Sequence, residues 1–392
     1  MKVLCLIGGL DPRHGGPPVA AVNSCIAAQR QGIETTLVYG FDPARPGAIA
    51  PALDRLATEG VAAIGLPYAK VLRETAESWG VCPTLPRWLM TNRRRFDVVH
   101  CHGAWQASAA ATLLTVASTG QPCVLTPHES LTEFDIAQSP RPILGFVKRA
   151  LQPTWLRGFD RVIVASSIEA RDSEPPHIAG RVRFAVVPHA VSDERKGTST
   201  PRGGSLRPGV LHVGFIGRLH PKKNIELLVR ALSTLPANVT LAVAGDGPER
   251  GRLQQLASRL GVTARIDWLG FIDEDAKRAF FAGIDILAMP SAYECFGVAA
   301  AEAMAAGVPV IVSADTGVAD IVAQREAGAV VATSVESIGA LLGALAASPE
   351  KLPAWSSHGI DAARSFFSFA AHGAALKSCY ERLLRDAAAR AA

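Results

Sequence analysis

The sequence predicts an α/β protein built from two Rossmann-like domains in tandem, and three observations lead to this prediction. The chain has 392 residues, which fits two domains of about 150–200 residues better than one ordinary core. Short, nearly continuous apolar runs alternate with helical patterns, as in a parallel sheet with helices on both faces. A polar Gly/Pro-rich segment interrupts this pattern, which then restarts with a strand, a glycine-containing loop and a helix.

The first half of the chain contains six predicted strands, each a short apolar run. Helical stretches such as 18–31 and 104–119 separate most of them. The strands are expected at 2–8, 34–40, 97–102, 123–128, 161–166 and 184–189. Together these elements predict a first domain over residues 1–191.

Residues 192–209 are polar, rich in Gly and Pro and without periodicity, which predicts a linker. A second domain is expected over 210–365. Its predicted strands are 210–217, 239–245, 265–270, 285–290, 308–313 and 327–332. A long helical pattern rich in Ala, Arg and Leu, at about 366–392, is expected to pack back onto the first domain.

Composition bounds the functional class. Hydrophobic residues make up 48% of the chain and charged ones 19%, so the chain is globular rather than disordered. A net charge of +5 suits anionic ligands but falls short of a nucleic-acid-binding protein. Seven scattered cysteines without a CxxC pair favour a reducing, cytoplasmic setting. The short, glycine-interrupted apolar run at the N-terminus predicts a buried strand rather than a signal peptide.

The segment "GFIGRLHPKKNIELLVRAL" (214–232) carries the first candidate site. Arg218 and Lys223 follow directly after a predicted strand, and a helix with Glu226 near its start comes next. Ligands of open α/β sheets bind beyond the carboxyl ends of the strands. Two cations beside a helix N-terminus there predict a phosphate site, and a solvated basic loop is the alternative.

The segment "VAGDGPERGRL" (243–253) has the same strand–loop–helix order. Gly245 and Gly247 would let a ligand approach the backbone closely. A tight turn capped by Asp246 explains the same residues equally well.

Two carboxylates, Glu294 and Glu302, stand eight positions apart in the uncharged stretch "YECFGVAAAEAMAAGVPVIVS" (293–313). Glu294 is expected in a loop and Glu302 within the alanine-rich helix that follows. The backbone N–H groups of Phe296, Gly297 and Val298 would lie at the helix start, ready for phosphate oxygens. Carboxylates on both sides of a phosphate site suit a sugar–diphosphate–ribose ligand. A glycosidase-like acid/base pair or two structural salt bridges are the competing interpretations.

With these segments in view, the chain resembles the retaining glycosyltransferases of family 4, which have the GT-B fold of two Rossmann-like domains facing each other across a cleft. The resemblance covers nearly the whole chain and is most specific in "GRLHPKKN", "AGDGPER" and the Glu-x7-Glu pair. It implies that Glu294 lies near the donor-sugar hydroxyls and Glu302 binds the ribose. It further implies that Arg218 and Lys223 hold the diphosphate. Asn224 departs from the family, which usually has Gly there.

The first domain resembles the family less closely. Gly15 and Gly16 precede a helix in a loop that, in the family, closes over donor phosphate and acceptor. His102 matches a histidine that contacts the donor sugar, and His128 with Glu129 falls in a loop expected to influence acceptor choice.

Metal dependence is not expected. A metal cluster of "HCH" (100–102) is disfavoured because further ligands at suitable spacing are missing. Successive strand residues also point to opposite faces, so only His100 and His102 share a side. The "DED" run (273–275) mimics a metal-binding DxD signature, but capping of the following helix is the favoured interpretation.

The resemblance implies transfer of a sugar from a nucleotide-diphosphate sugar to an acceptor hydroxyl with retention, by front-face attack and without a metal or other cofactor. The acceptor would be a sugar, a lipid-linked sugar or a small molecule, in polysaccharide or other glycoconjugate biosynthesis. A nucleotide-sugar epimerase or hydrolase of the same fold and a non-catalytic binding module are the alternatives. A nicotinamide dehydrogenase is disfavoured because "GGLDPRHGG" lacks GxGxxG spacing.

Peripheral membrane contact at the inner membrane face is a further expectation. The segments "PRWLMTNRRRF" (86–96) and "LGFVKRALQPTWLRGF" (144–159) mix aromatic and cationic residues, as surface-bound helices do. Ordinary half-buried helices with extended Arg side chains are the alternative.

Overall fold

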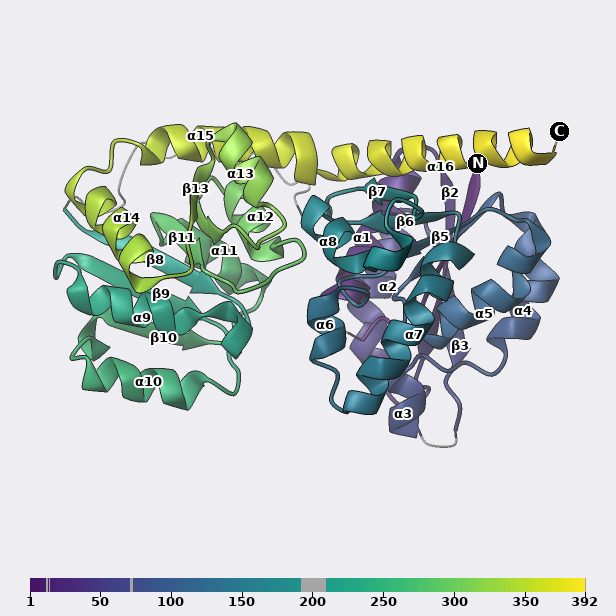
Figure 1. The fold of residues 1–392 in the computed structure, drawn as a ribbon, viewed down its shortest axis with the longest axis horizontal. Coiled ribbons are helices and arrows are strands. Elements are labelled where there is room, and N and C mark those ends of the chain that lie inside the picture. The colour runs from purple at the N-terminus through teal and green to yellow at the C-terminus, as the bar shows by residue number, and fades with distance from the viewer. Residues whose placement is uncertain (12, 14, 71–72, 192–208, 392) are drawn as a thin grey trace. The chain divides into compact units, whose positions relative to one another are not determined.

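A computed structural model describes the chain except residues 12, 14, 71–72, 192–208 and 392 (Figure 1). The chain forms two compact units. The first unit consists of residues 1–190 with 369–392, and the second of residues 191–368. The expected linker 192–209 lies, apart from its last residue, outside the described residues.

The first unit is built on a seven-stranded sheet whose described strand pairs are all parallel. Its strand order, β3-β2-β1-β4-β5-β6-β7, reverses direction between the neighbouring strands β1 and β4. Such a reversal opens a crevice at the carboxyl ends of the strands. The strands are β1 (Lys2–Ile7), β2 (Glu34–Phe41), β3 (Ala62–Pro67), β4 (Val98–His102), β5 (Cys123–Thr126), β6 (Arg161–Val164) and β7 (Phe184–Val186).

Helices cover both faces of this sheet (Figure 1). α1 and α2 contribute to an apolar cluster on one face, and α4, α5 and α7 contribute to the cluster on the other. The helices are α1 (Gly16–Arg30), α2 (Ala50–Thr58), α3 (Arg73–Ser78), α4 (Leu85–Asn92), α5 (Ala107–Thr115), α6 (Glu133–Ala137), α7 (Pro142–Gly158) and α8 (Ser167–Ser173).

The second unit repeats this design with six parallel strands in the order β10-β9-β8-β11-β12-β13. Its order reverses between β8 and β11. The strands are β8 (Leu211–Ile216), β9 (Val239–Ala244), β10 (Ile266–Gly270), β11 (Ile286–Met289), β12 (Val310–Ser313) and β13 (Gly328–Val331). The helices are α9 (Ile225–Thr234), α10 (Arg250–Arg259), α11 (Glu274–Ala282), α12 (Val298–Ala305), α13 (Ala319–Arg325), α14 (Val335–Ala347) and α15 (Leu352–Ala362).

The C-terminal helix, α16 (Phe369–Ala391), packs along α1 of the first unit. Gly373 permits this contact, because a Cβ there would collide with the carbonyl oxygen of Ala27. The Arg30 guanidinium lies 4.7 Å from the centre of the Phe369 ring. The helix begins three residues later than expected, because 363–367 form a wide π-helical turn that belongs to the second unit.

Two further features follow from the elements. Helix α16 is the longest helix described, and none of the described helices is both long and apolar enough to cross a membrane. All seven cysteines are free, and six of them are buried.

Candidate active site

The loops that follow β8 and β11 lie next to each other at the carboxyl edge of the second sheet. The backbone N–H of Ala292 donates to the carbonyl of Lys222 at 2.7 Å, which joins the two loops. Both loops leave the sheet at the point where the strand order reverses, which is where ligands of such sheets bind.

This contact brings together two of the residues that the sequence singled out. The Lys223 ammonium forms an ion pair with the Glu294 carboxylate, and both side chains are about four-fifths or more buried. Arg218 lies exposed in the same loop as Lys223. Asn224 adopts the left-handed conformation (φ 51°, ψ 32°), which Asn tolerates, so the turn does not need the family's usual Gly.

The Glu294 loop is fixed to the chain after β12. Glu294 accepts from the Gly317 N–H at 2.8 Å through its backbone carbonyl, and its own N–H donates to Asp315 at 3.0 Å. Gly297 caps α12 at φ 95°, where a Cβ would come within 2.8 Å of the Thr316 methyl. The glycine is therefore required by close packing as well as by its positive φ.

Helix α12 begins at Val298, so the N–H groups of Phe296, Gly297 and Val298 lie at its positive end. The Phe296 side chain points away from solvent and packs edge-on against the Phe367 ring at 5.5 Å. Only the backbone of Phe296 is therefore available to a ligand.

Glu302, in α12, pairs with Lys277 of α11 at 2.8 Å. Burial raises the pKa of the Glu302 carboxyl, and the Lys277 charge and hydrogen bond partly oppose this rise. Lys277 was not identified from the sequence, because 25 residues separate it from Glu302 and nothing local marks the pair. The neighbouring "DED" run caps α11, as expected, since Asp273 accepts from the Ala276 N–H at 2.8 Å.

The glycines of "AGDGPER" serve the packing of two loops. A Cβ at Gly245 would collide with the Gly217 carbonyl, and one at Gly247 would collide with the Leu219 carbonyl. Asp246 accepts from the Gly247 N–H at 2.7 Å and so closes its own turn. The tight-turn interpretation thus accounts for these residues, whatever ligand they also meet.

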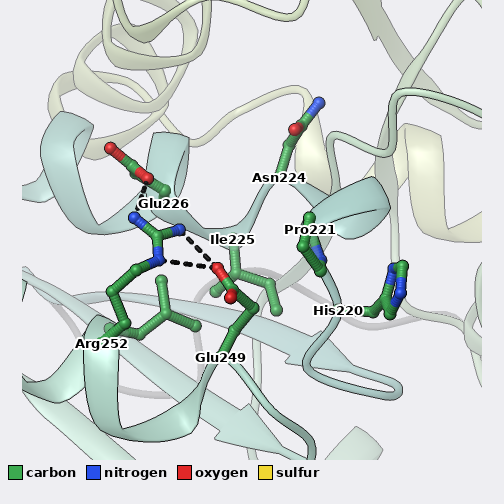
Figure 2. Close-up of a pocket in the computed structure, with 8 residues that line it drawn as sticks. His220, Pro221, Asn224, Ile225, Glu226, Glu249 and Arg252 are labelled. Atoms are coloured by element: carbon green, nitrogen blue, oxygen red, sulfur yellow. Dashed lines mark hydrogen bonds and ion pairs between the residues drawn. The ribbon is translucent and has the colours of Figure 1, made fainter.

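A pocket of about 210 Å³ borders the start of α9 (Figure 2). Arg252 forms ion pairs with both Glu226 and Glu249, at 2.5 and 2.6 Å. Dashed lines mark these interactions in Figure 2. Hydrogen bonds from Arg252 and Arg230 lower the pKa of Glu226. The lining includes neither Lys223 nor Glu294, so this pocket is adjacent to the predicted donor site and distinct from it.

At the carboxyl edge of the first sheet, the structure brings His102 and His128 together. Their rings stack with centroids 5.3 Å apart, and Nδ1 of His102 lies 3.1 Å from Nε2 of His128. The His128 ring in turn stacks on His189 at 5.6 Å. Nε2 of His102 is buried and has no hydrogen-bond partner among the described residues. It is a polar atom that a ligand hydroxyl could satisfy.

These imidazoles are held neutral. Burial lowers the pKa of His100 and His189 to about 3 and that of His372 to about 4. Burial also lowers the pKa of His102 and His128 well below the usual value.

Glu169 supports the His128 turn and was not identified from the sequence. His128 and Glu129 both have left-handed backbones, with φ 53° and 69°. The buried Glu169 carboxylate accepts from the N–H groups of Glu129 and Ala165, each at 2.7 Å. Burial raises the pKa of Glu169 to about 7.

The expectation that no further metal ligand lies near His100 and His102 is wrong. Cys5 of β1 is the register partner of His100, and ligand atoms of the three residues lie within 4.8 Å of one another. Both nitrogens of His100 are nevertheless hydrogen-bonded at 2.7 Å, to Tyr380 and Thr126. Metal binding there would have to break these bonds.

Gly15 and Gly16 stand at the start of α1. Gly15 caps the helix at φ 86°, and a Cβ at Gly16 would meet no atom of the described residues within 4 Å.

Two family models match the chain on either side of residue 200. "Glycosyltransferase Family 4" matches residues 14–195 and "Glycosyl transferases group 1" matches residues 205–361. The chain belongs to glycosyltransferase family 4. Both family models together include every residue predicted for the site.

Curated relatives of this family share parts of the chain. An uncharacterized glycosyltransferase of Methanocaldococcus jannaschii is 41% identical over 28% of this chain and 28% of its own length. The YqgM glycosyltransferase of Bacillus subtilis is 28% identical over 60% of this chain and 64% of its own. The D-inositol 3-phosphate glycosyltransferase of Mycobacteroides abscessus is 31% identical over 63% and 58%. The chain thus aligns with less than two thirds of each of these relatives.

Solved structures establish the GT-B fold. Sucrose-phosphate synthase from Thermosynechococcus elongatus superposes with a TM-score of 0.75 at 21% identity, over 98% of this chain and 100% of its own. Anabaena HepE in complex with UDP and glucose superposes with a TM-score of 0.70 at 17% identity, over 97% and 100%.

Proposed function

We propose that this protein transfers a sugar from a nucleotide-diphosphate sugar to an acceptor hydroxyl with retention of anomeric configuration. The observation that carries the proposal is the Lys223–Glu294 ion pair at the β8/β11 reversal, beside the N-terminus of α12. Family membership and the UDP and UDP-glucose complexes of the structural neighbour HepE support a donor of this class.

The diphosphate would bind between cations and amides. Lys223 and Arg218 come from one loop, and the N–H groups at the start of α12 come from the next. As the sugar–phosphate bond breaks, negative charge grows on the diphosphate, and preorganised donors stabilise this charge. No metal is needed in this scheme, because the two cations and the helix terminus supply the positive potential.

The resting ion pair would separate when donor binds. Lys223 would then pair with a phosphate, and Glu294 would accept hydrogen bonds from the sugar hydroxyls. Each charge exchanges one partner for another, so neither is left buried and unpaired.

Glu302 would hold the ribose. A carboxylate can accept from both ribose hydroxyls only when it is ionised. Lys277 opposes the rise in the pKa of Glu302 that burial causes, and so favours the ionised form of this acceptor.

The first domain would contribute to the binding of both substrates. Nε2 of His102 is suited to a hydroxyl of the donor sugar, and the loop that carries His128 and Glu129 would influence acceptor choice. Relatives that act on inositol phosphate, and a mannosyltransferase, support a hydroxylated acceptor in glycolipid, polysaccharide or other glycoconjugate biosynthesis.

A two-stage assay tests the proposal. UDP- and GDP-sugars are first screened by thermal shift, where ligand at a hundredfold its Kd adds about 2.7 kcal/mol of stability. Sugar transfer from the stabilising donor is then followed with and without acceptor alcohols, in the presence of a chelator. Acceptor-dependent consumption of donor is expected. Equal consumption without acceptor would indicate a hydrolase or epimerase, binding without turnover would indicate a binding module, and loss of activity with chelator would contradict metal independence.

A further inference from the structure

Helix α7 turns an apolar face toward solvent. Four of its large apolar side chains are between 40% and 68% exposed: Ile143, Phe146, Val147 and Leu151. Their spacing of three, four and eight positions from Ile143 places them on one side of the helix. We call these four residues the α7 apolar face.

The opposite side of α7 packs on the first domain. Gly145, Gln152 and Leu156 are buried. The Gln152 amide donates to the carbonyls of Leu131 and Ser173, at 2.6 and 2.9 Å. The helix is thus fixed with its apolar face outward, the reverse of an ordinary surface helix, whose exposed side is polar. A concentrated apolar patch on a folded surface usually marks an interaction site.

The charged residues of α7 and its flanking residues are all positive. Residues 138–159 contain no Asp or Glu, and they contain four cations, Arg141, Lys148, Arg149 and Arg157. Lys148 and Arg149 pair with Asp135 and Glu133 of α6. Arg141 and Arg157 are exposed and form no ion pair within the described part of the chain. Their charges flank the apolar face, one before the helix and one in its last turn.

The neighbouring helices extend this character. α4, α5 and α7 all pack on the same face of the first sheet, through Leu89, Ala109 and Leu156 (Figure 1). Residues 78–96, which include α4, also contain no acidic residue and carry a run of arginines at 93–95. Met90 of α4 and Leu114 of α5 are 61% and 79% exposed.

We infer that the α7 apolar face docks this protein on an anionic lipid surface. Apolar side chains on one side of a helix, flanked by cations and free of acids, match a membrane's apolar interior beneath its negatively charged headgroups. The four apolar residues enter the boundary between headgroups and acyl chains, and Arg141 and Arg157 pair with lipid phosphates. A protein partner is less favoured, because the face is the outer side of a single helix rather than a groove that could bury a partner. This inference goes beyond the proposed transfer reaction and does not depend on it.

The test is co-sedimentation of the purified full-length protein with phosphatidylcholine vesicles that either contain or lack phosphatidylglycerol. Binding is expected only with the anionic lipid, and it should weaken as salt is added. The Phe146→Ser/Val147→Ser variant should bind at least about tenfold less tightly, since it removes two apolar anchors. Phe271→Ser is the matched control, because Phe271 is 85% exposed in the second domain, and it should bind like the unchanged protein.

Thermal unfolding and donor-induced thermal shift confirm that each variant is folded. Three outcomes would overturn the inference. They are no binding to the anionic vesicles, equal binding by the Phe146→Ser/Val147→Ser variant, and a stable dimer that this variant converts to monomer. The last outcome would mean that a second copy of the chain covers the face.

Discussion

The two domains have similar sheet edges, but these edges carry different kinds of side chain. In the second domain, the edge carries largely buried charges joined in pairs, Lys223 with Glu294 and Lys277 with Glu302. In the first domain, the corresponding edge carries stacked imidazoles, with His102 between His100 and His128. Both edges lie where the strand order reverses.

The difference matches two tasks. Paired charges can exchange partners with a charged ligand without leaving either charge alone. Neutral imidazoles can donate and accept hydrogen bonds without adding charge, which suits neutral hydroxyl groups. The comparison therefore predicts that pH acts mainly on the first domain, and that charge-removing substitutions act mainly through the second.

The largest expected effect is destabilisation of the first domain by acid. Five histidines of the first domain have folded-state pKa values below the usual 6.5: His100, His102 and His372, which are buried, and His128 and His189, which are half-buried. The unfolded chain therefore binds more protons, so their stabilisation is complete above pH 6.5 and is lost as the pH falls toward 3. Each neutral histidine accounts for about 1.4 kcal/mol per pH unit within that window. Hydrogen exchange, followed by mass spectrometry at pH 7 and 5, should show α1 opening before α9.

A substitution in each domain sharpens this test. His189→Gln should flatten the pH dependence of the first domain's stability. His212→Gln changes a residue of the second domain and should leave the pH dependence of the first domain's stability unchanged. His212 is half-buried and bonds to Thr240 at 2.8 Å. Equal acid sensitivity of both domains would contradict the prediction that pH acts mainly on the first domain.

Loss of the Lys223 charge should have the next largest effect. Lys223→Ala is expected to lower kcat by roughly two orders of magnitude, by analogy with removal of a single preorganised donor. Lys222→Ala, at the adjacent position, is the control and should retain most activity. Steady-state kinetics with saturating donor would measure both, and near-normal turnover of Lys223→Ala would contradict its role.

Glu302→Gln should act on donor binding rather than on the chemical step. Loss of a charged acceptor costs about 1.5–3 kcal/mol, so the donor KM should rise roughly ten- to hundredfold while kcat changes little. Glu274→Gln is a matched control, since Glu274 also pairs with Lys277 but its side chain is 79% exposed. A fall in kcat at unchanged KM would argue against a ribose contact.

The smallest effect is expected at Glu169. Glu169→Gln keeps one acceptor oxygen but turns an N–H donor toward a backbone N–H, which should cost about 1 kcal/mol of stability. Faster hydrogen exchange should appear at the Glu129 and Ala165 amides. Glu174→Gln, whose amide oxygen can still accept from the Gly180 N–H at the surface, should leave both amides unchanged. Unchanged exchange in Glu169→Gln would show that the carboxylate does not hold the turn.

The sheets were largely predictable, because buried parallel strands are short continuous apolar runs. All twelve expected strands overlap observed ones, namely β1, β2 and β4–β13. Strand β3 was missed, because Ala62, Ala63 and Gly65 make it a weakly apolar edge strand with mostly exposed or half-buried positions. The break before α16 was missed as well, since the turn at 363–367 keeps a helix-like sequence.

The site residues also fall into two groups, those that local motifs predicted and those that only the fold identifies. Lys223 and Glu294 were named from motifs in which local spacing carries the information. Lys277 and Glu169 act on residues 25 and 40 positions away, so only the folded chain identifies them. Cys5 next to His100 is likewise a consequence of strand register that no spacing rule reveals.

The packing of α16 on α1 has a consequence for biosynthesis. Tyr380 and His372 supply hydrogen bonds to His100 and Ser24 inside the first domain, yet both are translated after the entire second domain. At about 5–20 residues per second, translation of the second domain takes on the order of ten seconds or more. The first domain's His100 and Ser24 wait this long for their partners in α16. The N-terminal domain therefore completes its interior only after the second domain has been translated, and a chain truncated before residue 369 has an α1 that lacks this neighbour.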